Sequence, residues 1–183
     1  KSSLTLDTYY KTSADIIGNV NYLYRDGAPD KMGNMTGAYR GSSLSVMNMV
    51  TGYFVNEYEG QEVDCSYARQ LTRQDFTQSC CNYLTNDTWK SCYKSINVAN
   101  AVIKYVDGVE MDNQAQYKAE ARFFRALNYF YLVKMFGDVP MVTEPTEDAT
   151  LVEYPTRTAA SEVFNTVIIP DLQFAVENLP NAT

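Results

Sequence analysis

The chain has 183 residues, a formal net charge of -7, fifteen tyrosines, four cysteines and no histidine. Because histidine is absent, a Ser-His-Asp or Cys-His nucleophile pair and a histidine-ligated zinc site are excluded. The acidic balance, without any run of lysine or arginine, leaves no electrostatic footprint for nucleic acid. With 45% hydrophobic and 20% charged residues, the composition is that of an ordinary globular chain. The length suits a single domain or part of a larger one.

The first predicted helix covers residues 13–24, where apolar side chains recur every three or four positions. Ser13 or Asp15 is expected to accept the unpaired N–H groups of its first turn. The Asp-Gly-Ala-Pro sequence at 26–29 ends this helix. A weaker apolar pattern predicts a short helix at 44–50.

Residues 53–86 show no sustained period of either the helical or the strand kind. A long irregular stretch inside a compact domain is usually functional or disordered. The many aromatic side chains here argue against disorder, so we predict a long, aromatic-rich loop.

Two long helices are predicted next, the first over 86–106 and the second over 113–136. The Asn-Asp-Thr sequence at 86–88 offers capping side chains for the first helix, and Gly137 is a natural stop for the second. Their short connection requires antiparallel packing. Two adjacent apolar stripes predict that the second helix is buried on most sides. One of these stripes comprises Phe123, Ala126, Phe130 and Val133.

A final helix is predicted over 158–179, after an extended, acidic stretch. The hydroxyl of Thr158 is expected to cap its start. Pro170 removes one internal hydrogen bond and is expected to kink it. The residues therefore predict an all-α array with one long irregular loop.

Three segments, in order along the chain, resemble the SusD/RagB-type outer-membrane lipoproteins. Residues 119–130 read AEARFFRALNYF and residues 136–140 read FGDVP, which together resemble the signature of that family. The stripe that begins at Trp89 resembles the family's preceding helix, and residues 154–180 resemble the following one. The resemblance therefore covers the second half of the chain in the expected order.

The resemblance implies an all-α fold of tetratricopeptide-like antiparallel helices. Residues 1–183 would form a single N-terminal helical domain, a portion of a longer chain. It also implies a non-catalytic lipoprotein on the surface of the cell outer membrane, attached only through a lipid anchor missing from this chain. Such a protein captures an oligosaccharide, or a peptide in RagB-type variants, for import through a SusC-like TonB-dependent transporter. No cofactor, metal or nucleic acid is implied.

Capture of a sugar requires aromatic platforms beside side chains that form hydrogen bonds. The irregular stretch gathers these residue types, and the resemblance places part of the ligand site in its later portion, at about 67–83. The predicted ligand-binding residues are Tyr58, Tyr67, Arg69, Arg73, Asp75, Phe76, Asn82 and Tyr83. The alternative is that these side chains pack the loop onto the helices.

Several side chains on the periodic helices are expected to have structural roles. Arg122 and Arg125 are expected to pair with Asp138 or with a carboxylate on a neighbouring helix. Tyrosines in strongly periodic segments are expected to pack in the core with their hydroxyl groups hydrogen-bonded; these are Tyr93, Tyr117, Tyr129 and Tyr131.

The four cysteines have no C-x2-C spacing, which argues against a zinc site. A secreted location would permit Cys65 to pair with one of the adjacent Cys80 and Cys81, and Cys92 with the other. Buried free thiols are the alternative. Two other functions also stay open: a glycosidase that uses carboxylates of residues 57–64, and a helical-repeat interaction module without a small ligand.

Overall fold

The structure is a computed structural model that describes residues 5–25, 48, 50–54, 70, 72–75, 79–146 and 155–181, with backbone only for 79–87. The predicted helix at 44–50 lies almost entirely outside these residues. Internal contacts divide the chain into two compact units. The first unit comprises Lys1–Arg25 and Tyr93–Thr183, and the second comprises Asp26–Cys92.

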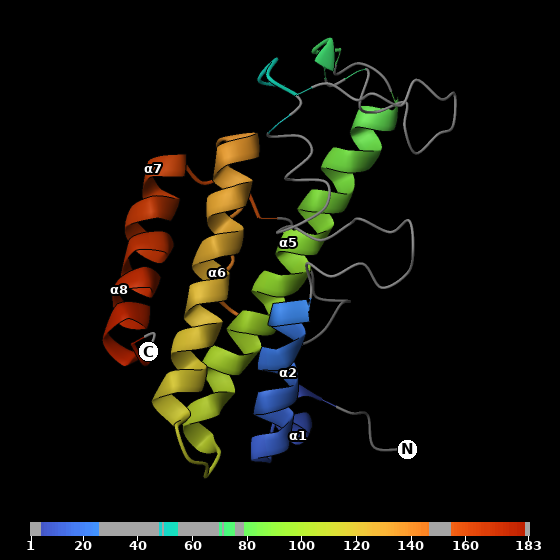
Figure 1. Cartoon of the computed structure of the whole chain (residues 1–183). Coiled ribbons are helices and arrows are strands. Elements are labelled where there is room, and N and C mark those ends of the chain that lie inside the picture. The colour runs from blue at the N-terminus through green and yellow to red at the C-terminus, as the bar shows by residue number, and fades with distance from the viewer. Residues whose placement is uncertain are drawn as a thin grey trace. The chain divides into compact units, whose positions relative to one another are not determined.

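The regular secondary structure of the described part of the chain is helical, and no β-strand occurs in it. Its one isolated β-bridge joins Val139 to Thr158. In the first unit α6 lies between α2 and α8 and contacts both (Figure 1). The predicted all-α fold is thus confirmed. The helices are α1 (Leu6–Tyr9), α2 (Ser13–Arg25), α5 (Ser79–Tyr105), α6 (Gln114–Phe136), α7 (Ala160–Val163) and α8 (Ile169–Asn178).

The start of α2 is capped by Thr12 together with Asp15. The Asp15 carboxylate accepts the backbone N–H of Thr12 at 2.8 Å, and the Thr12 hydroxyl accepts the N–H of Asp15 at 3.3 Å. This reciprocal pattern is a capping box. Hydrogen bonds from Thr12 lower the pKa of Asp15. Asp15 was an expected cap, but its partner is Thr12, one residue before Ser13.

Helix α5 begins at Ser79, which is earlier than the sequence predicted. The Asn-Asp-Thr sequence at 86–88 therefore lies inside the helix and does not cap it. These residues are poor helix formers, but intrinsic propensity is a weak preference that tertiary packing overrides. The predicted irregular loop is therefore shorter, because its last residues, from Ser79 on, belong to α5. The helix ends at Tyr105, where a short 3-10 turn follows.

Cys92, on α5, is buried and is not part of a disulfide bond. Of the two alternatives that the sequence left open, a disulfide and a buried thiol, the buried thiol therefore holds for Cys92. Cys65 and the side chains of Cys80 and Cys81 lie outside the described residues.

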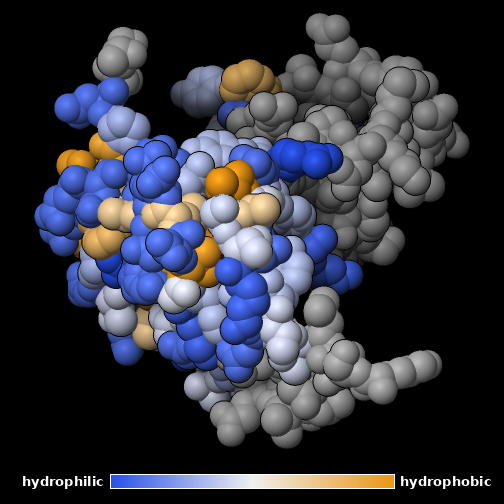
Figure 2. All heavy atoms as spheres, turned by 90° about the horizontal axis from the view of Figure 1, so that it is seen from below, coloured by the Kyte–Doolittle hydropathy of each residue, from blue (hydrophilic) through white to orange (hydrophobic). Residues whose placement is uncertain are grey.

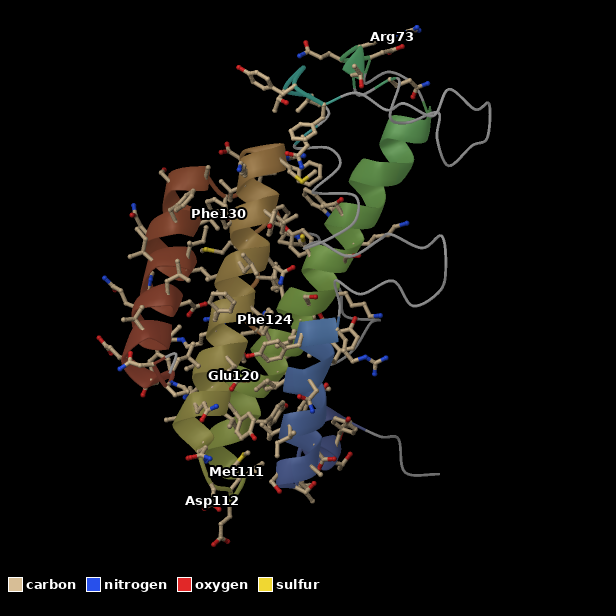
Figure 3. The ribbon with its side chains drawn as sticks, in the orientation of Figure 1. Arg73, Met111, Asp112, Glu120, Phe124 and Phe130 are labelled. Atoms are coloured by element: carbon tan, nitrogen blue, oxygen red, sulfur yellow. The ribbon has the colours of Figure 1, made fainter. Side chains whose placement is uncertain are left out.

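Helix α6 ends at Gly137, whose φ of 69° lies in the region that favours glycine, as predicted. Its Phe124 side chain points toward α2 and meets Tyr24 edge-on at 4.6 Å (Figure 3). The predicted burial on most sides holds for Ala126 and Val133 but not for two phenylalanines of the same stripe. Those are Phe123 and Phe130, both more than a third exposed.

The last helical segment differs from its prediction at its start. Thr158 pairs with Val139 and does not cap the helix. The carboxylate of Asp138 accepts the backbone N–H of Ala160 at 2.9 Å and caps α7 from outside the segment. A π-helical turn over Phe164–Ile168 separates α7 from α8 and precedes Pro170. Such turns accommodate a missing backbone hydrogen bond by local widening of the helix.

A buried ionic cluster joins α5, α6 and α8. Arg125 donates to Asp171 through Nε at 2.7 Å and Nη2 at 2.9 Å, and through Nη1 to Asn100 at 3.0 Å. Arg122 adds a 2.8 Å bond to the same carboxylate. Arg125, Asp171 and Asn100 are buried. The expected pairing of both arginines with a carboxylate on a neighbouring helix is confirmed.

The extended segment that follows α6 is held by side chains of α5 and α6. The Tyr129 hydroxyl donates to the carbonyl of Val142 at 2.8 Å and accepts its N–H at 2.7 Å. Tyr93 donates to the carbonyl of Pro140 at 2.7 Å, and Asn100 donates to that of Val142 at 3.0 Å. The predicted packing role is confirmed for Tyr93 and Tyr129.

Replacing Asp171 by alanine is expected to lower the free energy of unfolding by about 3–5 kcal/mol, because Arg125 would stay buried without its counter-charge. Chemical denaturation monitored by circular dichroism measures the change. Asp112→Ala is the matched control, since Asp112 is exposed at the α5–α6 connection (Figure 3), and we expect a change within about 0.5 kcal/mol. Equal effects of the two substitutions would contradict the role of the cluster.

Tyr129→Phe is expected to cost about 1–3 kcal/mol of folding stability, because the half-buried backbone N–H of Val142 loses its acceptor, whereas the Val142 carbonyl keeps Asn100 as a donor. Burial raises the pKa of Tyr129 to about 12. Its neutral hydroxyl therefore stabilises the fold fully below pH 10 and loses this contribution as the pH rises toward 12. Part of the alkaline loss of stability should disappear in the variant. Tyr117→Phe, on the same helix, should leave the denaturation curve nearly unchanged, because in the described residues the Tyr117 hydroxyl lacks the hydrogen bond that the sequence predicted.

Candidate functional site

Two of the eight predicted ligand-binding residues have described side chains, Arg73 and Asp75. Arg73 is exposed and Asp75 is half-buried. Asn82 and Tyr83 lie in helix α5, not in an irregular loop. Their side chains lie outside the described part of the structure. The other four predicted residues lie outside the described part of the chain: Tyr58, Tyr67, Arg69 and Phe76.

Two turns of the second unit, one at 50–53 and one at 73–74 that follows the helical residues Gln70 and Thr72, are joined by a hydrogen bond. The side-chain amide of Gln74 donates to the carbonyl of Val50 at 3.2 Å. The backbone N–H of Asp75 closes the later turn by donating to the carbonyl of Gln70 at 2.9 Å. Gln74 itself has a φ of 56°, which is uncommon for a residue other than glycine. The Gln74–Val50 bond thus brings together segments twenty-four residues apart.

The earlier turn exposes two consecutive aromatic side chains. Tyr53 is 90% exposed and Phe54 is 56% exposed. They follow Gly52, whose φ of 77° is readily adopted by glycine alone. We call Tyr53, Phe54, Arg73 and Asp75 the turn surface.

Tyr53 and Phe54 were not among the predicted ligand-binding residues, although they open the irregular stretch. The available signal was an aromatic pair directly after a glycine. Because the chain turns at that position, neither side chain belongs to a helix or strand face that could pack against a core.

The turn surface combines the groups that a carbohydrate site needs. Exposed aromatic rings offer flat apolar area to the C–H face of a sugar. In the same unit, the guanidinium of Arg73 can donate hydrogen bonds to hydroxyl groups, and the carboxylate of Asp75 can accept them. In the described residues, no cluster of cysteine, aspartate or glutamate side chains could hold a metal ion. The carboxylates of residues 57–64, considered for a glycosidase, lie outside these residues.

None of the helices in the described part of the chain combines the length and the apolar character needed to cross a lipid bilayer.

Comparison with known proteins places the chain in a family. Residues 29–183 match the SusD-like family described as starch-binding and associating with the outer membrane. The chain belongs to this family, as the sequence signature predicted. SusD-like protein P2 of Formosa agariphila is 27% identical over 180 residues, which are 97% of this chain and 33% of that protein.

Solved structures of the superfamily have the same fold. A SusD-like carbohydrate-binding protein of Bacteroides fragilis superposes with a TM-score of 0.73 at 18% identity, over 95% of this chain and 33% of that one. A laminarin-binding SusD-like protein superposes with a TM-score of 0.69 at 22% identity, over 93% and 35% of the two chains. The chain thus spans about a third of the length of these relatives.

Proposed function

We propose that the protein captures a glycan without catalysis and delivers it for import through a SusC-like TonB-dependent transporter. The observation that carries this proposal is the turn surface, where Tyr53 and Phe54 are exposed in the same unit as Arg73 and Asp75. Membership of a family described as starch-binding and associating with the outer membrane supports the location at that membrane. A lipid anchor on a preceding segment would complete the attachment.

A glycan is favoured over a peptide as the captured nutrient. The similar proteins are a carbohydrate-binding and a laminarin-binding member of the superfamily. Exposed aromatic rings also suit a pyranose ring, which presents C–H groups on its faces and hydroxyl groups at its rim. The predicted residues of the same stretch, such as Tyr67 and Phe76, would extend the turn surface.

Tyr53→Ala and Phe54→Ala are each expected to weaken glycan binding about tenfold, because each removes one aromatic platform. Isothermal titration against laminarin, xyloglucan, starch-derived and peptide ligands measures the affinity. Arg73→Ala should weaken it as well through lost hydrogen bonds. The matched control is Tyr24→Ala, which removes an exposed tyrosine from the first unit and should leave the affinity unchanged.

Three results would point to other functions. Binding of peptides in place of glycans would indicate a RagB-type variant. Absence of binding to every ligand would favour a helical-repeat interaction module. Release of reducing sugar, abolished by Glu57→Gln or Glu62→Gln, would indicate a glycosidase.

We further propose that the helical domain is one portion of a longer chain whose additional residues pack on α8. Three apolar side chains follow one face of this helix at spacings of three and four, and all three are exposed. They are Ile169, Leu172 and Val176, which we call the α8 row. Seen from the end where α5 and α6 connect, hydrophobic groups form only small patches among hydrophilic ones (Figure 2). The exposure of the α8 row supports its role as a surface for further packing.

Val176→Asp tests this packing, because Val176 is 83% exposed in the 183-residue chain. In that chain the substitution should change the free energy of unfolding by at most about 0.5 kcal/mol. In the protein with its additional residues it should cost about 2 kcal/mol or more, since a charge would be buried without a partner. Thermal unfolding of both lengths supplies the comparison, and equal small changes would contradict the proposal.

A further inference from the structure

A cavity of about 350 Å³ is lined by residues of the first unit, whereas the residues of the turn surface belong to the second. Its walls come from α1, α2, the C-terminal half of α5 and Thr146 at the end of the extended segment. Small-molecule sites typically measure about 300–1,000 Å³, so this cavity has the size of a small ligand site.

Tyr9 and Tyr10 supply the aromatic wall of the cavity. Tyr10 is buried and stacks on Tyr105, with ring centroids 5.3 Å apart and planes inclined by 7°. Tyr9 meets Tyr10 edge-on at 5.0 Å and is 39% exposed. The Tyr10 ring is therefore fixed by its neighbours, and it supports a Tyr9 ring that a ligand can contact.

Two half-buried asparagines on this cavity each keep one amide atom available. Asn19 donates to the carbonyl of Asp15 at 2.8 Å and to the Tyr9 hydroxyl at 3.3 Å, which leaves its Oδ1 without a hydrogen bond in the described residues. The Oδ1 of Asn97 accepts the N–H of Thr146 at 2.7 Å. The Nδ2 of Asn97 has no hydrogen bond in the described residues. The cavity thus offers one acceptor and one donor held in place by their own neighbours.

Among the described residues that line the cavity, none has a charged side chain. A phosphate, carboxylate or ammonium ligand would lack the counter-charge that makes its desolvation favourable. Hydroxyl groups require no counter-charge, and each of them both donates and accepts. Val98 and Ala101 add apolar surface to the tyrosine wall.

We propose that this cavity binds one neutral pyranose unit, either a free monosaccharide or the end of an oligosaccharide, as a second sugar site. Tyr9 contacts the face of the ring, while Asn19 Oδ1 and Asn97 Nδ2 bind hydroxyl groups. The ligand class rests on the proposed glycan function, but the site itself lies in a different unit from the turn surface.

NMR titration of the ¹⁵N-labelled chain with glucose, galactose, mannose and xylose tests this site, with sorbitol as the acyclic control. We expect saturable shifts of the Asn19 and Asn97 side-chain amides with at least one ring sugar and none with sorbitol. Tyr9→Ala should weaken the binding about tenfold, whereas Tyr9→Phe, which keeps the ring, should bind nearly as well as the unchanged protein. Val98→Phe fills the cavity and should abolish the shifts.

Arg73→Ala serves as the control in the other unit and should leave these shifts unaltered. If no sugar gives a saturable shift, or if Tyr9→Ala binds the sugar with unchanged affinity, the proposed site is wrong. Equal shifts with sorbitol or with a neutral peptide would also overturn it. Oligosaccharide binding that depends on Tyr53 but not on Tyr9 would refute this site alone and leave the proposed capture function intact.

Discussion

The ion pair between Arg125 and Asp171 is the constraint on which the arrangement of the helices depends. Burying two charges removes them from water, and this desolvation cancels much of their attraction. The net contribution of the pair to stability is therefore small even when the geometry is ideal. Removal of either partner lowers folding stability strongly, however, because the other charge stays buried without a partner. A packing of the helices that separates the two charges has the same cost. Because Arg125 reaches both Asp171 on α8 and Asn100 on α5, three helices must meet in one register for every polar group to be satisfied. The cluster thus selects one packing of the helices among several that apolar stripes alone would allow.

Asn100 extends this constraint to the segment that follows α6. Its Oδ1 accepts from Arg125, and its Nδ2 donates to the carbonyls of Val142 and Glu144. Tyr129 completes the attachment from α6 through both backbone groups of Val142. The extended segment is therefore an integral part of the helical unit, and Thr146 at its end closes one wall of the cavity. A core interaction in this way positions a surface site.

The residue types of the candidate glycan site were predictable from the sequence, but which individual residues are exposed was only partly predictable. Aromatic, arginine and aspartate side chains crowd the irregular stretch, and Arg73 is indeed exposed there. Tyr53 and Phe54 could not be singled out, because their exposure depends on the backbone of Gly52 and on the bond from Gln74 to Val50. The cavity beside Tyr9 had no sequence signal, since α1, α2 and α5 contribute its walls from distant parts of the chain.

The sequence by itself determined the helical class, the two long central helices with Gly137 as a stop, and the family to which the chain belongs. These features follow from periodicity and from motifs within one segment, where each residue acts on near neighbours. Tertiary structure alone decided that α5 starts at Ser79, that Asp138 caps α7 from another segment, and that Phe123 and Phe130 stay partly exposed. The Asp138–Ala160 bond, for example, joins residues twenty-two positions apart, and such contacts are not visible in the local patterns from which a helix is predicted.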